Sequence, residues 1–229
     1  MAQIRVLVAD DHELVRCGIV RMLSDIDTIQ VVGEASSGED VLAFCRQAFS
    51  DQELSGERGV DIVLMDIRMP GLGGLEATRR LTARYPEVKV VALSSFDDRV
   101  YTRKILEAGA RGYLSKGSAT SEILRCLQTV AAGKRYLSAD VASALAIESL
   151  NPSDGNPFSR LSPQEFQVAN MVMDCYKVSD IAQALAIEPK TVNSYRYRIF
   201  EKLGVKSDVA MTRLAIQHGV IEVGCVLQI

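Results

Sequence analysis

The stretch Ile62-Val63-Leu64-Met65-Asp66 is a continuous apolar run that ends on a carboxylate. A strand buried on both faces of a sheet has this pattern, because neither of its sides meets water. Similar runs occur at 4–9, 31–32, 88–93 and 113–114. Segments with helical periodicity lie between them, at 13–24, 38–49, 75–85, 98–108 and 121–132. The alternation predicts an α/β domain built on a five-stranded parallel sheet.

The second half of the chain has no strand signal. The stretch Ser149–Pro157 is dense in Pro, Gly, Asn and Ser, which predicts a linker. Beyond it, short helical segments are separated by Ser, Asp and Pro residues that suit helix starts. We therefore expect a compact four-helix unit. The length of 229 residues also favours two small domains over a single core.

Composition excludes several classes of protein. With 48% hydrophobic residues, 24% charged residues and a net charge of -3, the chain is neither mainly disordered nor a coiled coil. It has no apolar run near the roughly 18 residues that span a bilayer and no basic, apolar leader, so we expect a cytoplasmic protein without a membrane partner. Its 5 cysteines are widely spaced, which favours reduced thiols.

Polar residues follow the predicted strands at their carboxyl ends, which is where parallel sheets bind ligands. These residues are Asp10, Asp11, Asp66, Ser94 and Lys116. Taken singly, Asp and Ser after a strand are most often turn formers or helix caps, and Lys is most often solvated. Because all of them fall at strand ends of one sheet, we expect a shared functional site.

The chemistry of this set favours phosphoryl transfer. Carboxylates within a few ångström repel one another unless a cation joins them, and Mg²⁺ prefers such oxygen ligands. Asp66 would act as the nucleophile towards phosphorus. Lys116 would neutralise charge on the phosphoryl group, and Ser94 would donate a hydrogen bond to one of its oxygens.

Four motifs resemble the receiver domain of bacterial two-component response regulators. They are Val8-Ala9-Asp10-Asp11-His12, Leu64-Met65-Asp66-Ile67-Arg68-Met69-Pro70-Gly71, Leu93-Ser94 and Gly112-Tyr113-Leu114-Ser115-Lys116. The resemblance covers residues 3–133 and implies a flavodoxin-like fold and phosphorylation of Asp66 by a sensor histidine kinase or phosphotransfer protein. It also implies that Asp11, Asp66 and the Arg68 backbone carbonyl bind Mg²⁺, with Asp10 assisting through water.

The same resemblance implies a switch pair, Ser94 and Tyr113. In a receiver the hydroxyl moves towards the phosphoryl group while the ring turns inward. A buried core tyrosine is the alternative explanation of Tyr113. The sequence departs from the family at 48–60, which is longer than usual by about ten residues. Because this segment precedes the third strand, away from the strand ends that carry the site, we expect function to survive.

Residues 178–186 and 189–203 have the form of a helix-turn-helix. On helical spacing, the inward face of the second helix is predicted to comprise Val192, Tyr195, Ile199 and Leu203. Its outward face is predicted to comprise Lys190, Asn193, Ser194 and Tyr197, with Arg198 and Lys202 on one flank. Short polar side chains at the front of such a helix can read bases, and basic residues bind phosphates. A solvated face is the alternative for these basic residues.

Motifs in this half resemble the LuxR-type DNA-binding domain over about 158–222. They are Leu161-Ser162-Pro163-Gln164-Glu165, Val178-Ser179-Asp180-Ile181-Ala182, Pro189-Lys190-Thr191-Val192-Asn193-Ser194-Tyr195 and Lys202-Leu203-Gly204-Val205. A receiver followed by this domain is typical of the NarL/FixJ class. Within that class, residues 133–137, 190–202 and 215–219 resemble the GacA/UvrY regulators.

This second resemblance implies a sequence-specific transcriptional regulator of the activator type that binds double-stranded DNA as a homodimer. The helix at 207–218 would pair two molecules. The residues expected to contact DNA are Lys190, Thr191, Asn193, Ser194, Tyr197, Arg198 and Lys202. The expected division is a receiver domain at 1–133, a linker with a short helix at 134–157, a LuxR-type domain at 158–222 and a tail at 223–229.

Three other functions fit the sequence less well. Phosphatases of the haloacid dehalogenase type also use an Asp nucleophile with Mg²⁺ and Lys, but they need a second Asp where this chain has Arg68. Nucleotide enzymes are disfavoured because the chain lacks GxxxxGK and GxGxxG motifs. A receiver-like regulator that works without phosphorylation is disfavoured by the complete set of pocket residues. We therefore expect a regulator and not an enzyme.

Overall fold

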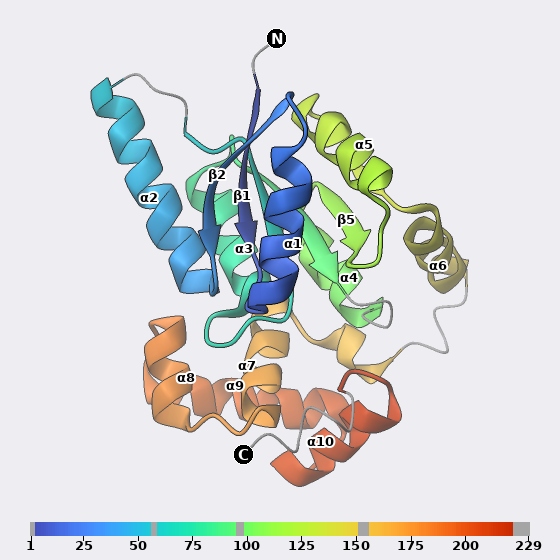
Figure 1. Ribbon diagram of the computed structural model, residues 1–229. Helices are drawn as coiled ribbons and strands as arrows, with labels where there is room; N and C mark the ends of the chain where they lie inside the picture. Colours follow the sequence, from blue (N-terminus) through green and yellow to red (C-terminus); the bar gives the residue numbers. More distant parts are fainter. Residues whose placement is uncertain (1–2, 56–58, 95–98, 151–155, 222–229) are drawn as a thin grey trace. The chain divides into compact units, whose positions relative to one another are not determined.

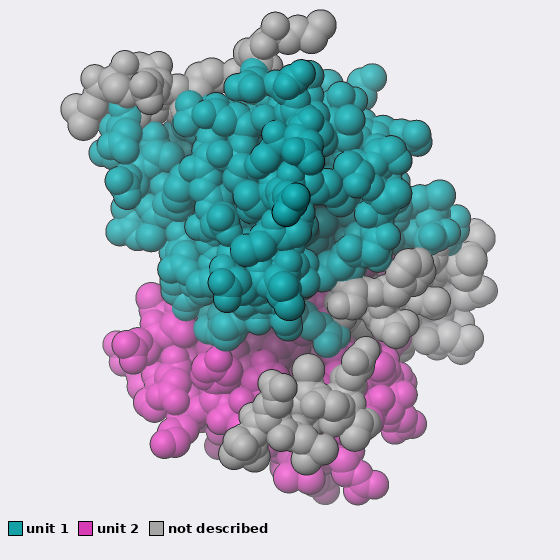
Figure 2. Space-filling model, in the orientation of Figure 1, with its two compact units in different colours: residues 1–96, 105–143 teal, residues 97–104, 144–229 magenta. Residues whose placement is uncertain are grey.

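The computed structural model describes residues 3–55, 59–94, 99–150 and 156–221. Backbone contacts divide the chain into two compact units, shown in different colours in Figure 2. The first comprises 1–96 and 105–143, and the second comprises 97–104 and 144–229. No helix in the described part of the chain is long and apolar enough to cross a membrane.

The first unit is built on a parallel sheet, as the sequence predicts, but the predicted number of strands is wrong. Within the described residues the sheet has 6 strands in the order β2-β1-β3-β4-β5-β6. They are β1 Ile4–Ala9, β2 Ile29–Ala35, β3 Ile62–Asp66, β4 Lys89–Ser94, β5 Gly112–Ser115 and β6 Tyr136–Leu137. The additional strand, β6, pairs with β5 through Gly112 and Tyr136. Its 2 residues are too few to produce an apolar run.

Helices cover both faces of the sheet (Figure 1). The helices in this half of the chain are α1 Glu13–Ser24, α2 Gly38–Ser55, α3 Gly73–Arg84, α4 Arg99–Glu107, α5 Thr120–Ala131 and α6 Ala139–Leu150. Leu23 of α1 and Leu127 of α5 join the core formed with Val6, Val8 and Leu64 of the strands. The helices α2 and α3 pack on the opposite face. Both faces are therefore buried, which explains the continuous apolar runs.

Helix α2 is longer than the sequence indicated. It was expected to end at Phe49 but continues to Ser55, so part of the long 48–60 segment is additional helix. The ring of Phe49 stacks on Tyr85, with centroids 4.6 Å apart and planes 11° apart. This contact lies at the residue where the sequence pattern predicted the end of the helix. It involves residues far apart in the sequence and is invisible to local periodicity.

The second unit contains the predicted helices α7 Pro163–Met173, α8 Val178–Leu185, α9 Pro189–Leu203 and α10 Asp208–Gln217, preceded by the short 3-10 helix η2 Pro157–Arg160. Ser162 and Glu165 form a capping box at the start of α7, and Ser207 caps α10. Residues 151–155 of the expected linker and the expected tail, with Cys225, lie outside the described residues. Cys17, Cys45, Cys126 and Cys175 are free thiols.

Gly74 has no room for a side chain, because the backbone of Asp66 and Ile67 lies directly against it. A Cβ added there would lie 2.0 Å from the carbonyl oxygen of Asp66 and 2.9 Å from Cα of Ile67. We expect Gly74→Ala to lower the free energy of unfolding by about 1–3 kcal/mol, since the backbone that carries Asp66 must shift. Urea denaturation measures this change.

The matched control is Gly18→Ala in α1, where an added Cβ meets nothing within 4 Å. It should stabilise the chain by about 0.5–1 kcal/mol, because alanine has the better helix propensity. Equal effects of the two substitutions would contradict the role given to the contact at Gly74.

Candidate functional site

Two carboxylates are buried side by side at the carboxyl end of the sheet. Asp10 directly follows β1, and Asp66 is the last residue of β3. These strands are neighbours, with Ala9 paired to Met65. Asp10 is 0% exposed and Asp66 is 2% exposed. The apolar runs that build the sheet therefore hold the two acids out of water.

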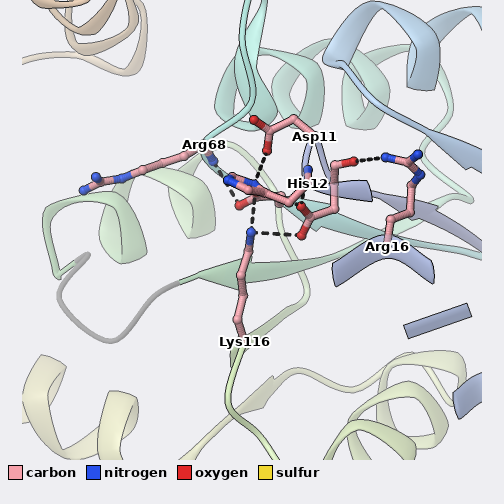
Figure 3. Close-up of polar contacts among 7 residues, drawn as sticks. Asp11, His12, Arg16, Arg68 and Lys116 are labelled. Atoms are coloured by element: carbon pink, nitrogen blue, oxygen red, sulfur yellow. Dashed lines mark hydrogen bonds and ion pairs between the residues drawn. The ribbon is translucent and has the colours of Figure 1, made fainter. Parts of the chain in front are cut away.

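Lys116, just beyond β5, joins both acids (Figure 3). Its Nζ lies 2.8 Å from Oδ2 of Asp66 and 2.9 Å from Oδ2 of Asp10. The backbone N–H of Lys116 also donates to the carbonyl oxygen of Ser94 at 2.7 Å, which ties the lysine to the end of β4. A single ammonium group thus serves two carboxylates.

The pKa values of Asp66 and Lys116 reflect burial and the charges of the neighbouring groups. Burial raises the pKa of Asp66 to about 6; Lys116 opposes the rise, and Asp10 adds to it. Burial by itself would lower the pKa of Lys116, but Asp66 and Asp10 outweigh that effect and raise it. A further cation at the site would favour the ionised carboxylates.

Asp11 completes an acidic cluster with His12. Single ligand atoms of Asp10, Asp11, His12 and Asp66 all lie within 4.8 Å of one another. His12 Nδ1 is 2.9 Å from Oδ1 of Asp11 and 3.5 Å from Oδ1 of Asp10 (Figure 3). A close group of carboxylate oxygens that share a single ammonium group suits a hard divalent cation.

Two contacts at this site were not foreseen from the sequence. The His12 backbone N–H donates to Oδ1 of Asp10 at 2.9 Å, and Arg16 Nη1 donates to the Asp10 carbonyl at 2.8 Å (Figure 3). Arg16 also binds Glu34 through Nε at 3.0 Å. His12 belongs to the receiver motif Val8-Ala9-Asp10-Asp11-His12, whereas no sequence pattern indicated that Arg16 contacts the site.

The remaining predicted pocket residues lie at or near these strand ends. Ser94 ends β4 and is 1% exposed, while Tyr113 is paired with Ala92 inside the sheet and is 3% exposed. The backbone N–H of Arg68 donates to Oδ1 of Asp66 at 3.1 Å. Tyr113 is thus buried in this structure.

The second unit contains the predicted helix-turn-helix. Helix α8 ends at Leu185 and is followed by Ala186, which adopts a left-handed conformation with φ 55°. Helix α9 begins at Pro189 and ends at Leu203, before Gly204 with φ 67°. Val192, Ile199 and Leu203 are buried, while Lys190, Asn193, Ser194, Tyr197 and Arg198 are exposed. Thr191 is half-buried. The exposed fraction of Tyr197, 74%, is unusual for a tyrosine.

Tyr195 was expected on the inward face of α9 but is only half-buried. Its hydroxyl donates to Oε1 of Gln164 at 2.9 Å. This hydrogen bond holds the ring at the border of the packed face, because the hydroxyl needs a polar partner.

Two of the basic residues of α9 pair with carboxylates of neighbouring helices. Lys202 Nζ lies 2.6 Å from Oε2 of Glu165, and Arg196 Nη2 lies 2.5 Å from Oδ2 of Asp208. Glu165 is 3% exposed. Burial acts to raise the pKa of Glu165, but the hydrogen bonds from Lys202 and the Ser162 backbone outweigh it and lower the pKa.

Comparison with known proteins identifies the family. The response regulator receiver domain matches residues 6–128, and the LuxR family of bacterial regulatory proteins matches 159–215. Response regulator GacA of Pseudomonas protegens is 48% identical over 219 residues, which cover 96% of this chain and 98% of that protein. Response regulator UvrY of Escherichia coli K12 is 46% identical over 217 residues, which cover 94% and 95%. The chain belongs to the GacA/UvrY response regulators.

As a GacA/UvrY regulator, the chain is a two-component transcriptional regulator with a receiver domain and a LuxR-type DNA-binding domain. The family predicted from the motifs is confirmed. RcsB of Salmonella enterica, solved with promoter rprA, shares the fold with a TM-score of 0.70 at 21% identity, covering 93% of this chain and 98% of RcsB. ChrA, from a heme-sensing two-component system, has a TM-score of 0.53 at 30% identity, covering 96% and 100%.

The ion pair between Lys202 and Glu165 should stabilise the second unit. We expect Lys202→Met to lower the free energy of unfolding at pH 7 by about 1–2 kcal/mol, because Glu165 stays buried while losing its ammonium partner. The pKa of Glu165 in the folded chain lies below 4.5, the ordinary value of a glutamate side chain. The contribution is therefore present above pH 4.5 and is lost as the pH falls through the folded pKa.

Urea denaturation of both proteins from pH 7 downwards measures this difference. Lys190→Met is the control, because Lys190 is exposed in the first turn of α9 and has no carboxylate partner among the described residues. It should change stability by less than about 0.5 kcal/mol. A pH-independent loss in Lys202→Met would count against the ion pair.

Proposed function

We propose that Asp66 is the residue that accepts the phosphoryl group, from a sensor histidine kinase or a phosphotransfer protein. The observation that carries this assignment is the bridge from Lys116 to both Asp66 and Asp10. Beyond accepting this group, the chain is proposed to have no catalytic role. We keep the proposed division into a receiver domain at 1–133, a linker at 134–157, a LuxR-type domain at 158–222 and a tail at 223–229.

We propose that Mg²⁺ binds at the acidic cluster, through Asp10, Asp11, Asp66 and the Arg68 backbone carbonyl. The close approach of the carboxylates and the raised pKa of Asp66 support a cation here. When bound, Mg²⁺ would neutralise the carboxylates and the oxygens of the incoming phosphoryl group.

The chain's own residues divide the work of phosphoryl transfer. An Oδ atom of Asp66 attacks phosphorus, the bond from phosphorus to the donor nitrogen breaks, and an acyl phosphate forms on Asp66. Lys116 stays close and offsets the added negative charge, while Ser94 donates a hydrogen bond to a phosphoryl oxygen. Tyr113 is the proposed partner of Ser94 in the resulting switch.

For the second unit, we propose that α9 enters the major groove of double-stranded DNA. The proposed contacts are Lys190, Thr191, Asn193, Ser194, Tyr197, Arg198 and Lys202. The exposure of Asn193, Tyr197 and Arg198 supports their part in this set. Lys202 would have to contact phosphate while paired with Glu165. Two chains would pair through α10, where Val209 is 71% exposed and Ile216 is 36% exposed, and bind DNA as a homodimer.

Asp66→Asn should abolish phosphorylation, because an amide oxygen is a poor nucleophile and forms no stable acyl phosphate. Incubation with acetyl phosphate and Mg²⁺, followed by intact-mass measurement, gives the extent of labelling. Asp140→Asn, an exposed carboxylate in the first turn of α6, is the control and should label fully. Full labelling of the Asp66 variant would show that another residue accepts the group.

Asp11→Ala should weaken Mg²⁺ binding by about tenfold or more, since it removes an oxygen ligand without opening the core. Isothermal calorimetry on the unphosphorylated chain measures the affinity directly. Glu13→Ala, two residues further along the chain and also acidic and exposed, should bind Mg²⁺ like the unaltered protein. Equal affinities in the two variants would remove Asp11 from the proposed ligand set.

Substitutions on α9 should separate base contacts from phosphate contacts. Asn193→Ala and Tyr197→Ala should reduce the preference for an operator, found by footprinting genomic DNA, over random DNA. Arg198→Ala should weaken binding to both DNAs alike and reduce the slope of log affinity against log salt by about one. Competition binding at several salt concentrations tests this difference. The same response from all three variants would refute the proposed orientation of α9.

A further inference from the structure

Tyr195 occupies an unusual position between two polar groups. Its hydroxyl donates to Oε1 of Gln164 at 2.9 Å, and the Cζ of Arg198 lies over its ring, 4.6 Å from the ring centroid. Gln164 is in the first turn of α7, whereas Tyr195 and Arg198 are three residues apart on α9 and so lie on the same side of that helix. The three side chains form one connected set, which we call the Gln164–Tyr195–Arg198 relay.

The charge of Arg198 is available, in contrast to that of its neighbours. Arg196 is paired with Asp208, and Lys202 is paired with Glu165. Within the described part of the chain, Arg198 contacts the Tyr195 ring and the Ser194 carbonyl at 3.4 Å but no carboxylate. An exposed guanidinium held by an aromatic ring keeps its full positive charge.

Such a guanidinium is well suited to binding a phosphate. Arginine stacks on aromatic rings through the face of its planar group, and its N–H donors lie in the plane of that group. The ring contact therefore orients the side chain and leaves donors free for an anion. An arginine that is already oriented loses less conformational freedom when it binds.

The hydroxyl of Tyr195 adds a second level of positioning. Without a partner, an exposed tyrosine on a helix is free to change rotamer. The hydrogen bond to Gln164 fixes the ring relative to α7, and α7 packs directly on α9. Gln164 therefore acts on Arg198 through the ring, without contacting the guanidinium itself.

We propose that Tyr195 and Gln164 are positioning residues that hold Arg198 in the orientation in which it binds a phosphate of the DNA backbone. This inference rests on the proposed function of α9 and extends it to two residues that are not themselves proposed to contact DNA. The part of the DNA affinity that does not depend on DNA sequence would then depend on Gln164, a side chain of α7.

The test measures binding of the full-length chain to a fluorescent random-sequence duplex of about 30 base pairs at several salt concentrations. Arg198→Ala and Tyr195→Leu should each weaken binding about threefold. The double variant should bind no more weakly than Arg198→Ala alone, because without the guanidinium there is nothing for the ring to position. Arg198→Ala should reduce the salt slope by about one.

Smaller changes separate positioning from packing. Tyr195→Phe and Gln164→Ala remove the same hydrogen bond, so each should weaken binding less than Tyr195→Leu does, and combining them should add nothing. Thermal melting of each variant reports any general loss of folding. If Tyr195→Leu fails to fold, Tyr195→Phe and Gln164→Ala are each combined with Arg198→Ala instead. Neither double variant should bind more weakly than Arg198→Ala alone.

Distinct results would overturn the inference. Independent, multiplicative losses in the Tyr195→Leu and Arg198→Ala double variant would show that the ring acts without the arginine. Unchanged binding by Tyr195→Leu or by Arg198→Ala would show that the substituted residue has no part in the relay. The proposed DNA binding by the unaltered chain would not be affected by that result. Failure of the unaltered chain to bind any duplex would overturn the proposed function together with the relay.

Discussion

The receiver unit depends on a shortage of positive charge at the end of its sheet. Asp10 and Asp66 end neighbouring strands and are almost completely buried, yet they share the single ammonium group of Lys116. Apolar residues on both faces of the sheet enforce this arrangement, since moving either acid into water would require the strands themselves to move. The pKa of Asp66 is raised mainly by its burial, and the charge of Asp10 adds to the rise. A site in this condition responds strongly to any added charge, whether that charge is a cation or a phosphoryl group.

Local patterns were sufficient for the features that depend on burial alone. The bounds of β1 and α1 agree with the sequence prediction, because long apolar runs and clear periodicity define them. Features that depend on a distant partner were missed. The strand β6 exists because Tyr136 meets Gly112, and α2 passes its expected end where Phe49 stacks on Tyr85. The same reason applies at the site, where strand ends grouped Asp10, Asp66 and Lys116, but the contact of Arg16 with the Asp10 carbonyl left no trace in the sequence.

In the second unit, too, local spacing predicted burial but not the contacts between distant residues. Helical spacing correctly placed Val192, Ile199 and Leu203 in the core. It could not show that the carboxylates for Arg196 and Lys202 come from α10 and α7. A basic helix that looks uniform in sequence is therefore divided in the structure into charges that hold helices together and charges that remain available. Lys202 is among the paired charges. To make its proposed contact with phosphate it must give up part of its interaction with Glu165.

Each unit pairs a buried acid with a lysine, but the pKa of the acid shifts in opposite directions in the two units. Asp66 shares Lys116 with Asp10, and its pKa is raised. At Glu165 the hydrogen bonds from Lys202 and from the Ser162 backbone, the latter at 2.8 Å, outweigh the effect of burial, and its pKa is lowered. A carboxylate with enough donors stays ionised and stabilises the fold, as at the start of α7. At the end of β3, burial outweighs Lys116 and the Arg68 backbone N–H, so the pKa of Asp66 stays raised and an added cation there would favour the ionised carboxylate.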